Sequence, residues 1–265
     1  MERINGTALR QQLAYGYLRF YRRPKLELTE YSSRTPEEEW VRFQNVQRRA
    51  VLQLAAYYDR AARQVGREMA EVFAIHAMLL EDEDLVETTR SRVWDEGNTA
   101  EFAVQTVGQR FGAAFSAMDD PYMRARSGDI RDIARRVIRM LIEQKWEDPL
   151  VDGPAILVAN TLLPSEVMEL DCKRLLGIVA RRGTVDSHAA LLLHAYGIPA
   201  MVDVELDEEW DGHLALMDGF DQCLYVDPEQ DLLEELRARY QAGAARPGEQ
   251  GGIKRENQLL SGDTP

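Results

Sequence analysis

Hydrophobic positions recur every three or four residues from Thr35 to about Trp146. This spacing places apolar side chains along one face of an α-helix. The first helix is expected to begin at Thr35, because Thr35 can cap, Pro36 suits the first helical position and Glu38 completes a capping box. Its predicted buried face consists of Trp40, Phe43, Val46, Ala50, Val51, Leu54 and Tyr58.

The same pattern predicts further helices, with Gly66 and Gly97 as breaks. One runs through Met69, Val72, Phe73, His76 and Leu80, and the next through Leu85, Val86 and Val93. Another begins at Asn98 or Thr99, and a last one follows the Asp120-Pro121 stop-and-start signal. Residues 31–146 are therefore expected to form an all-α bundle.

After Pro149 the pattern changes to short apolar runs separated by Gly, Pro, Asn or Asp, as expected for buried strands. These runs are Ala155–Ala159, Leu176–Ala180, Ala200–Val204, Leu214–Met217 and Cys223–Val226. Helical character lies between some of them, at 164–170 and 187–196. Residues 5–22 also suggest a strand or hairpin. If this early strand completes the later sheet, the bundle is an insertion into an α/β domain made of residues 1–30 and 147–230. Residues 231–265 are expected to form a final helix and a linker.

Composition narrows the class of protein. A chain of 265 residues with 45% hydrophobic residues has enough apolar surface for a buried core. Its two cysteines form no metal-binding motif and suit a reducing cytosol. We found no apolar run long enough to span a membrane and no signal-peptide core, so a cytoplasmic location is expected.

The chain carries a net charge of −13. This charge argues against general binding to nucleic acid, whose phosphates would repel it. It can steer a basic protein partner, or it can serve solubility alone.

The most informative segment is 183–199. An apolar strand ends at Ala180, a polar turn follows Gly183, and Ser187-His188 open a short helix. A helix N-terminus stabilises an anion through its unpaired amides and its dipole. A phosphoryl group on His188 would therefore be held by these amides and by the hydroxyls of Thr184 and Ser187. Neutral imidazole is an available nucleophile near pH 7. A capping or purely structural role for His188 is the alternative.

This segment resembles the swivelling phosphohistidine domain of phosphoenolpyruvate-utilising enzymes. The match rests on Gly183, Ser187, His188 and Gly197-Ile198-Pro199-Ala200. By that resemblance, the fold is an α/β swivelling phosphohistidine domain with an inserted all-α bundle, and His188 is the phosphorylated residue.

The helical segment resembles enzyme I of the bacterial sugar phosphotransferase system, through residues 75–85, 96–101, 117–122 and 124–132. The resemblance implies that the helical subdomain docks the small carrier HPr. The positions matching the docking surface are Glu68, His76, Met78, Leu79, Asp82, Asp84, Leu85 and Arg126. An apolar patch with an acidic rim suits a partner with basic groups. Spacing alone favours the other interpretation, in which the leucines belong to the bundle core and the acids form a solvated face.

The resemblance also implies that phosphoenolpyruvate and Mg²⁺ bind a separate C-terminal domain. No cofactor or metal is therefore expected within this chain, which should not use phosphoenolpyruvate on its own. Family enzymes dimerise through that other domain, so a fragment of this kind is expected to be monomeric.

The sequence departs from the family pattern close to His188. Asp186 stands where Thr is usual, Val185 where enzyme I often has Arg, and His194 where Arg is usual. The opening segment 8–16 lacks the family's Ser-Pro-Gly. An extra carboxylate would repel a phosphoryl group, so an enzyme I-like paralogue that binds a carrier without turnover is one alternative. A swivelling domain of a dikinase or of phosphoenolpyruvate synthase is another.

Overall fold

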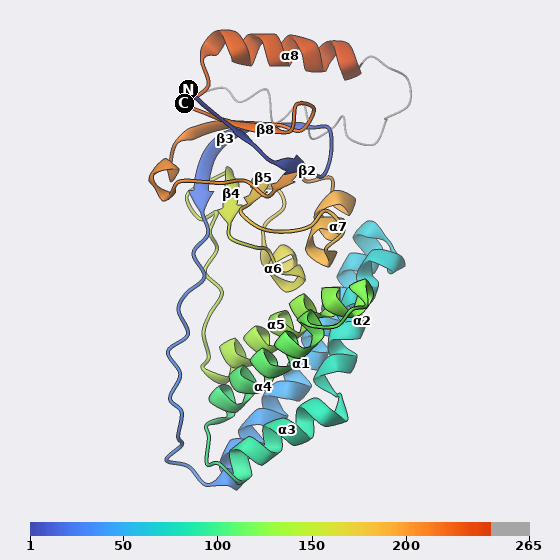
Figure 1. Ribbon diagram of the computed structural model, residues 1–265, viewed down its shortest axis with the longest axis vertical. Helices are drawn as coiled ribbons and strands as arrows, with labels where there is room; N and C mark the ends of the chain where they lie inside the picture. Colours follow the sequence, from blue (N-terminus) through green and yellow to red (C-terminus); the bar gives the residue numbers. More distant parts are fainter. Residues whose placement is uncertain (245–265) are drawn as a thin grey trace. The chain divides into compact units, whose positions relative to one another are not determined.

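The computed structural model describes residues 1–244, except for the side chains of residues 121, 122, 125, 237 and 239–244. The chain forms two compact units. The first contains residues 1–22, 148–162 and 169 onward, and the second contains residues 23–147 and 163–168. Figure 1 shows a sheet in the first unit and a bundle of helices in the second.

The first unit is built on an eight-stranded mixed sheet in the order β1-β8-β7-β3-β4-β5-β6-β2. The strands are β1 (Glu2–Asn5), β2 (Thr7–Ala8), β3 (Leu13–Phe20), β4 (Ala155–Ala159), β5 (Leu175–Ala180), β6 (Ala200–Val202), β7 (Leu214–Asp218) and β8 (Cys223–Val226). Strands β3, β4, β5 and β6 run parallel, and the other pairings are antiparallel. The early strand β3 therefore lies inside the sheet, between β7 and β4.

The two outermost strands, β1 and β2, are consecutive in the chain and separated only by Gly6. One extended segment thus pairs with β8 before Gly6 and with β6 after it. Since three residues span at most about 10 Å, the sheet must curl until its two sides meet. A side chain at Gly6 would overlap Val204 and Met201, so this crossing requires glycine.

The curled sheet encloses one apolar core, and its outer face carries a second. The enclosed core includes Ala14, Leu18, Ile156, Val179 and Met217. Outside it, helix α8 (Gln230–Ala244) packs Leu232, Leu233 and Leu236 against strands β3, β7 and β8. The side chains of β4 and β8 are buried along their whole length and those of β7 nearly so, which explains the nearly continuous apolar sequences of these strands.

The second unit contains α1 (Pro36–Val65), α2 (Arg67–Leu80), α3 (Glu83–Trp94), α4 (Ala100–Ser116), α5 (Pro121–Leu141) and all but the last residue of α6 (Pro164–Glu169). The predicted capping box is present, with the Thr35 hydroxyl accepting from the Glu38 amide and the Glu38 carboxylate accepting from the Thr35 amide. Gly66 and Gly97 have positive φ angles, 101° and 68°, and break the helical path as predicted.

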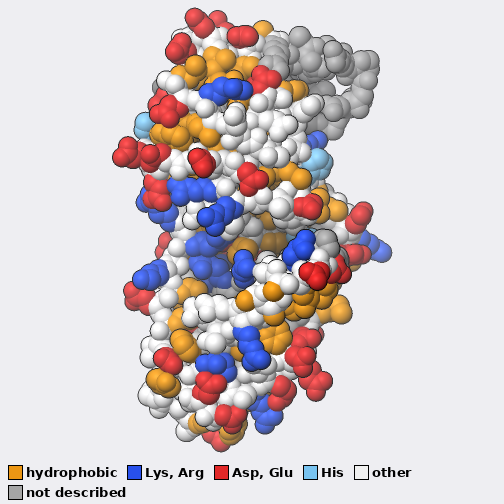
Figure 2. Space-filling view, viewed as in Figure 1, with side chains coloured by type: hydrophobic (Ala, Val, Ile, Leu, Met, Phe, Trp, Pro, Cys, Tyr) orange, Lys and Arg blue, Asp and Glu red, His pale blue; other side chains and the backbone are white. Residues whose placement is uncertain are grey.

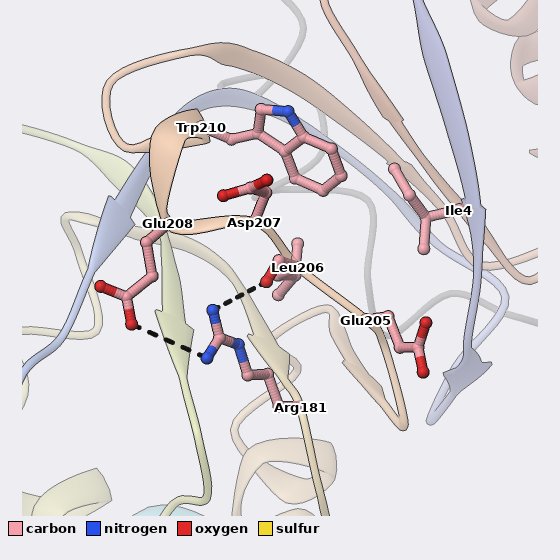
Figure 3. A pocket seen from close by; sticks show the side chains of 7 residues that line it. All are labelled: Ile4, Arg181, Glu205, Leu206, Asp207, Glu208 and Trp210. Carbon is pink, nitrogen blue, oxygen red and sulfur yellow. Dashed lines mark hydrogen bonds and ion pairs between the residues drawn. The ribbon is translucent and has the colours of Figure 1, made fainter.

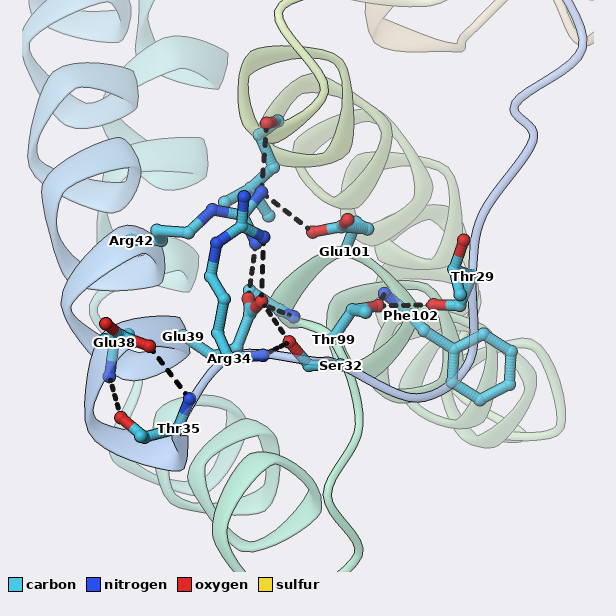
Figure 4. Close-up of polar contacts among 12 residues, drawn as sticks. Thr29, Ser32, Arg34, Thr35, Glu38, Glu39, Arg42, Thr99, Glu101 and Phe102 are labelled. Atoms are coloured by element: carbon cyan, nitrogen blue, oxygen red, sulfur yellow. Dashed lines mark hydrogen bonds and ion pairs between the residues drawn. The ribbon is translucent and has the colours of Figure 1, made fainter.

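A buried carboxylate organises the entry to the bundle (Figure 4). Glu39, which is 1% exposed, accepts hydrogen bonds from the Ser32 hydroxyl at 2.7 Å and the Ala100 amide at 3.1 Å. It also forms ion pairs with Arg34 and Arg42. The incoming segment and helices α1 and α4 are therefore held by one side chain.

These elements confirm the predicted fold class, an α/β domain with an inserted helical bundle. The division into units differs from the prediction: residues 23–30, residue 147 and most of α6 group with the helical unit, and α8 groups with the sheet unit. The expected final helix is present as α8, whereas the expected linker at 245–265 lies outside the described residues. A short 3-10 turn, η1 (Glu208–Trp210), and helix α7 (His188–Ala195) complete the first unit.

Candidate functional site

His188 is the first residue of α7 and follows the helix cap directly. Ser187 has extended backbone angles, and its hydroxyl accepts from the Ala190 amide at 3.3 Å. The imidazole is half-buried and therefore partly open to solvent. This confirms the predicted helix start, at which first-turn amides and the helix dipole favour a bound anion.

The residues before His188 form an exposed turn. The Ser187 amide donates to the Thr184 carbonyl at 3.2 Å, so Val185 and Asp186 occupy the two central positions. Gly183, Thr184 and Asp186 are all exposed. The turn thus brings the Asp186 carboxylate into the segment that leads into α7.

His194 lies at the other end of α7. It is six positions after His188, a rise of about 9 Å along the helix axis. The expectation that His194 borders the phosphate site stays a prediction, and the two imidazoles belong to opposite ends of the helix. The His194 carbonyl oxygen accepts from the Gly197 amide at 3.0 Å and from Arg10 Nη1 at 3.3 Å.

Arg10 is a site-related residue that the sequence analysis did not identify. It belongs to the loop between β2 and β3 and brings a cation to the carboxyl end of α7. A cation there opposes the negative end of the helix dipole. The contact joins residues 184 positions apart, so no local pattern indicated it.

The loop leading to His188 is also joined to the connection that follows β4. The Arg181 amide donates to the Ala159 carbonyl and the Arg182 amide to the Asn160 carbonyl, both at 2.9 Å. These bonds extend the pairing of β4 and β5 past the strand ends. The loop after β4 and the loop after β5 are therefore hydrogen-bonded to each other where they leave the sheet.

A shallow cleft of about 640 Å³ lies elsewhere in the first unit (Figure 3). It is lined by Ile4, Arg181, Glu205, Leu206, Asp207, Glu208 and Trp210. Its guanidinium is already occupied, since Arg181 donates to the Leu206 carbonyl at 2.7 Å and lies 3.8 Å from the Glu208 carboxylate. The carboxylates of Glu205, Asp207 and Glu208 would repel a phosphate, and the single cation of the cleft is already paired.

The predicted docking residues separate into exposed and buried groups. Met78 is 71% exposed, Glu68, Asp82 and Asp84 are exposed, and Leu79 is half-buried. Asp82 also caps α3, accepting from the Leu85 amide at 3.1 Å. Met78, Leu79, Asp82 and Asp84 thus lie at or beside the turn between α2 and α3, whereas Glu68 lies in the first turn of α2.

His76, Leu85 and Arg126 are buried, with exposures of 0%, 8% and 7%. They offer little surface in this structure, and their role in docking stays a prediction. Leu85 packs within the bundle. The helical spacing of His76 with Val72, Phe73 and Leu80 was a signal for its burial.

His76 and Arg126 belong to a buried polar network. His76 Nε2 lies 3.1 Å from Asp129 Oδ1, and Arg126 Nη1 donates to Asp129 Oδ2 at 3.2 Å. His76 Nδ1 lies 3.9 Å from Asp132 Oδ2. Burial raises the pKa of the Asp132 carboxyl, while the His76 charge and the hydrogen bonds from Ser165 act in the opposite direction. Mutual pairing of these groups offsets the desolvation that each would otherwise suffer.

Charged side chains cover both units. On the face shown in Figure 2, acidic side chains occur over the sheet unit and over the helical unit. Among the described residues, no helix is long and apolar enough to cross a membrane. In the same part of the chain, no group of three His, Cys, Asp or Glu side chains is arranged to hold a metal ion.

Comparisons with known proteins agree with this architecture. Residues 5–126 match the family described as PEP-utilising enzyme, N-terminal, and residues 151–222 match PEP-utilising enzyme, mobile domain. The phosphoenolpyruvate-protein phosphotransferases of Bacillus sp. (strain S) and Geobacillus stearothermophilus are each 29% identical over 248 residues. Each alignment covers 91% of this chain and 43% of the relative, so the chain spans less than half of those proteins.

Two solved structures share the fold. A solution structure of an enzyme I protein has a TM-score of 0.68 at 24% identity and covers 91% of this chain and 99% of its own. A structure described as the N-terminal domain of Enzyme 1 - Nitrogen has a TM-score of 0.60 at 27% identity, covering 90% of this chain and 99% of its own. The chain therefore belongs to the phosphoenolpyruvate-utilising enzymes and corresponds to the N-terminal domain of enzyme I.

Proposed function

We propose that this chain is the phosphoryl-carrying part of an enzyme I-type relay, in which His188 exchanges a phosphoryl group with an HPr-like carrier protein. The observation that carries the proposal is the position of His188 as the first residue of α7, directly after the Ser187 cap. A partly open imidazole at a helix N-terminus can act as a nucleophile and then have its phosphorylated form stabilised there.

The chemistry requires few groups. A neutral ring nitrogen of His188 attacks phosphorus with its lone pair, and the bond from phosphorus to the carrier breaks as the new P–N bond forms. The first-turn amides of α7 stabilise charge on the phosphoryl oxygens. Because the Ser187 hydroxyl accepts a hydrogen bond from Ala190, it keeps its own proton available as a donor.

The proposed docking surface is centred on Met78 and Leu79, with Asp82 and Asp84 beside them and Glu68 at the beginning of α2. Its chemistry fits a small partner that presents an apolar contact within a basic rim. Phosphoenolpyruvate and Mg²⁺ are assigned in this proposal to a C-terminal domain of the full-length enzyme. The chain on its own is then expected to be monomeric and unable to use phosphoenolpyruvate.

A transfer assay tests the proposal. The chain is incubated with phosphorylated HPr, and its intact mass is measured under mildly alkaline conditions. The wild-type chain and a His194→Ala control should each gain one phosphoryl group, whereas His188→Ala should gain none. Phosphorylation that persists in His188→Ala would refute the assignment.

Asp186 favours a second candidate function, an enzyme I-like protein that binds a carrier without turnover. Its carboxylate is exposed in the turn before His188 and opposes an incoming phosphoryl group. Saturable binding of HPr with no gain of mass in the wild-type chain would establish this second function in place of the first.

A further inference from the structure

Helix α6 has only six residues, and the chain inserts it between two neighbouring parallel strands, β4 and β5. A helix of this length is not stable by itself in water. Residues 163–168 nevertheless group with the helical unit, so contacts from that unit must hold the helix in place.

The first of these contacts is a cap supplied by another helix. Asp132, on α5, accepts the Ser165 amide at 2.9 Å through Oδ2 and the Ser165 hydroxyl through Oδ1. Both residues are buried, at 1% and 5% exposure. A carboxylate at this position satisfies an amide that the first turn leaves unpaired and also opposes the helix dipole.

The second contact is an ion pair on the same turn. Arg23 Nε and Nη2 donate to the two oxygens of Glu166 at 2.6 and 2.7 Å. Glu166, 3% exposed, also accepts the Leu163 amide at 3.0 Å. The paired geometry fixes orientation as well as distance, so α6 is anchored at its beginning from two directions.

The anchored turn lies close in sequence to the loop of His188. Leu163 is three residues after Asn160, whose carbonyl accepts the Arg182 amide at 2.9 Å. Arg182 begins the segment that continues through Thr184 to His188. Only Thr161 and Leu162 therefore separate Asn160 from Leu163, whose amide bonds to Glu166 in the anchored turn.

We infer that Asp132 and Arg23 are positioning residues for the phosphoryl-transfer site. By anchoring α6 through Ser165 and Glu166, they fix the Asn160–Arg182 hydrogen bond and hence the loop that presents His188. This inference deepens the proposed function and rests on it for its effect on rate. The contacts that position the loop belong to the helical unit and are separate from the proposed docking surface.

Two variants loosen the anchor while leaving Asp132 inside its buried network. Ser165→Ala removes one hydroxyl hydrogen bond, and Arg23→Gln removes the ion pair with Glu166. The matched controls are Thr106→Val, which removes a hydroxyl bond to the Phe102 carbonyl, and Arg90→Gln, which removes the exposed pair with Glu87. Thermal unfolding verifies that all four variants are folded at the assay temperature.

Amide hydrogen exchange measures the structural effect without any carrier. Loss of one supporting hydrogen bond should accelerate exchange at the Arg182 amide about fivefold in Ser165→Ala and in Arg23→Gln. The two controls should match the wild type. Unchanged protection of Arg182 in both anchor variants would overturn the inference, whether or not the chain transfers a phosphoryl group.

Phosphoryl transfer from phosphorylated HPr measures the functional effect. The anchor variants should lose about tenfold in the transfer rate at saturating carrier, because transfer is sensitive to small misplacements of the nucleophile. The carrier concentration at half-maximal rate should stay as in the wild type. Transfer at the wild-type rate in both folded variants would likewise overturn the positioning role, whereas a wild-type chain that accepts no phosphoryl group would instead reject the proposed function.

Discussion

Arg10 Nη1 donates a hydrogen bond to the carbonyl oxygen of His194 across the first unit, at a distance of 3.3 Å. His194 lies in the last turn of α7, and a cation from a different loop reaches this end of the helix. We therefore expect Arg10→Gln to weaken the last turn of α7 by about 0.5–1 kcal/mol. Amide exchange at Gly197 and Ile198, which bond to the carbonyls of His194 and Leu193, measures the effect.

Arg10→Lys is the matched control, because it keeps the positive charge. If the helix dipole is the cause, Lys should retain most of the protection that Gln loses. Equal losses in the two variants would contradict the electrostatic explanation.

Asp186 provides a test of charge next to the nucleophile. Asp186→Asn removes one negative charge from the exposed turn and should accelerate phosphoryl uptake by about fivefold to tenfold at low salt. The gain should shrink at high ionic strength, where exposed charges are screened. Glu229→Gln makes the same change of net charge at the exposed residue preceding α8, and an equal acceleration there would show that only the total charge matters.

Met78 and Leu52 form a matched pair for the docking surface. They are 71% and 70% exposed, on α2 and α1 respectively. Met78→Lys should weaken HPr binding at least tenfold, since a central apolar contact is replaced by a charge. Leu52→Lys should leave binding unchanged, and neither variant should alter the melting temperature. Calorimetric titration distinguishes the two, and equal losses of affinity would remove the assignment of the surface.

Glu39 predicts a pH-dependent stability. Burial alone would raise the pKa of Glu39, but the hydrogen bonds from Ser32 and Ala100 and the charges of Arg42 and Arg34 together lower it. Its stabilising contribution is therefore present above the ordinary value of 4.5 and is lost as the pH falls through the lower folded value. Glu39→Gln should reduce the free energy of unfolding by about 1–3 kcal/mol at pH 7.

The difference between Glu39→Gln and the wild type should narrow when denaturant unfolding is repeated below about pH 4.5. The control is Glu37→Gln, which changes an exposed carboxylate in the same helical turn. A difference in unfolding free energy that stayed constant from pH 7 down to acid unfolding would contradict the role of the ionised Glu39.

Local patterns predicted the elements of this fold better than their assembly. The caps at Thr35 and Ser187 involve residues three apart, and the sequence displayed both. The place of β3 inside the sheet depends on pairing with strands more than a hundred residues away, which periodicity does not encode. The grouping of α6 with the helical unit depends likewise on Asp132 and Arg23, which lie 33 and 143 positions from their partners.

The candidate site shows the same division. His188 was identified because a helix start and a motif coincide within a few residues. His76 was assigned to a surface although its helical spacing placed it with buried residues, and the structure follows the spacing. Arg10 and the Asn160–Arg182 bond were not foreseen, because both depend on the way distant loops meet.

The crossing at Gly6 has a consequence for how the protein behaves in a crowded solution. An open sheet exposes rows of unpaired amides and carbonyls along its border, and such borders recruit strands from other molecules. Here the segment through Gly6 pairs with β8 before the glycine and with β6 after it, so it covers both borders of the sheet. While this segment stays paired with both strands, the sheet unit offers few sites for intermolecular strand addition. If the first eight residues detach, two borders are exposed at once, and strand exchange between copies becomes the expected route to aggregation.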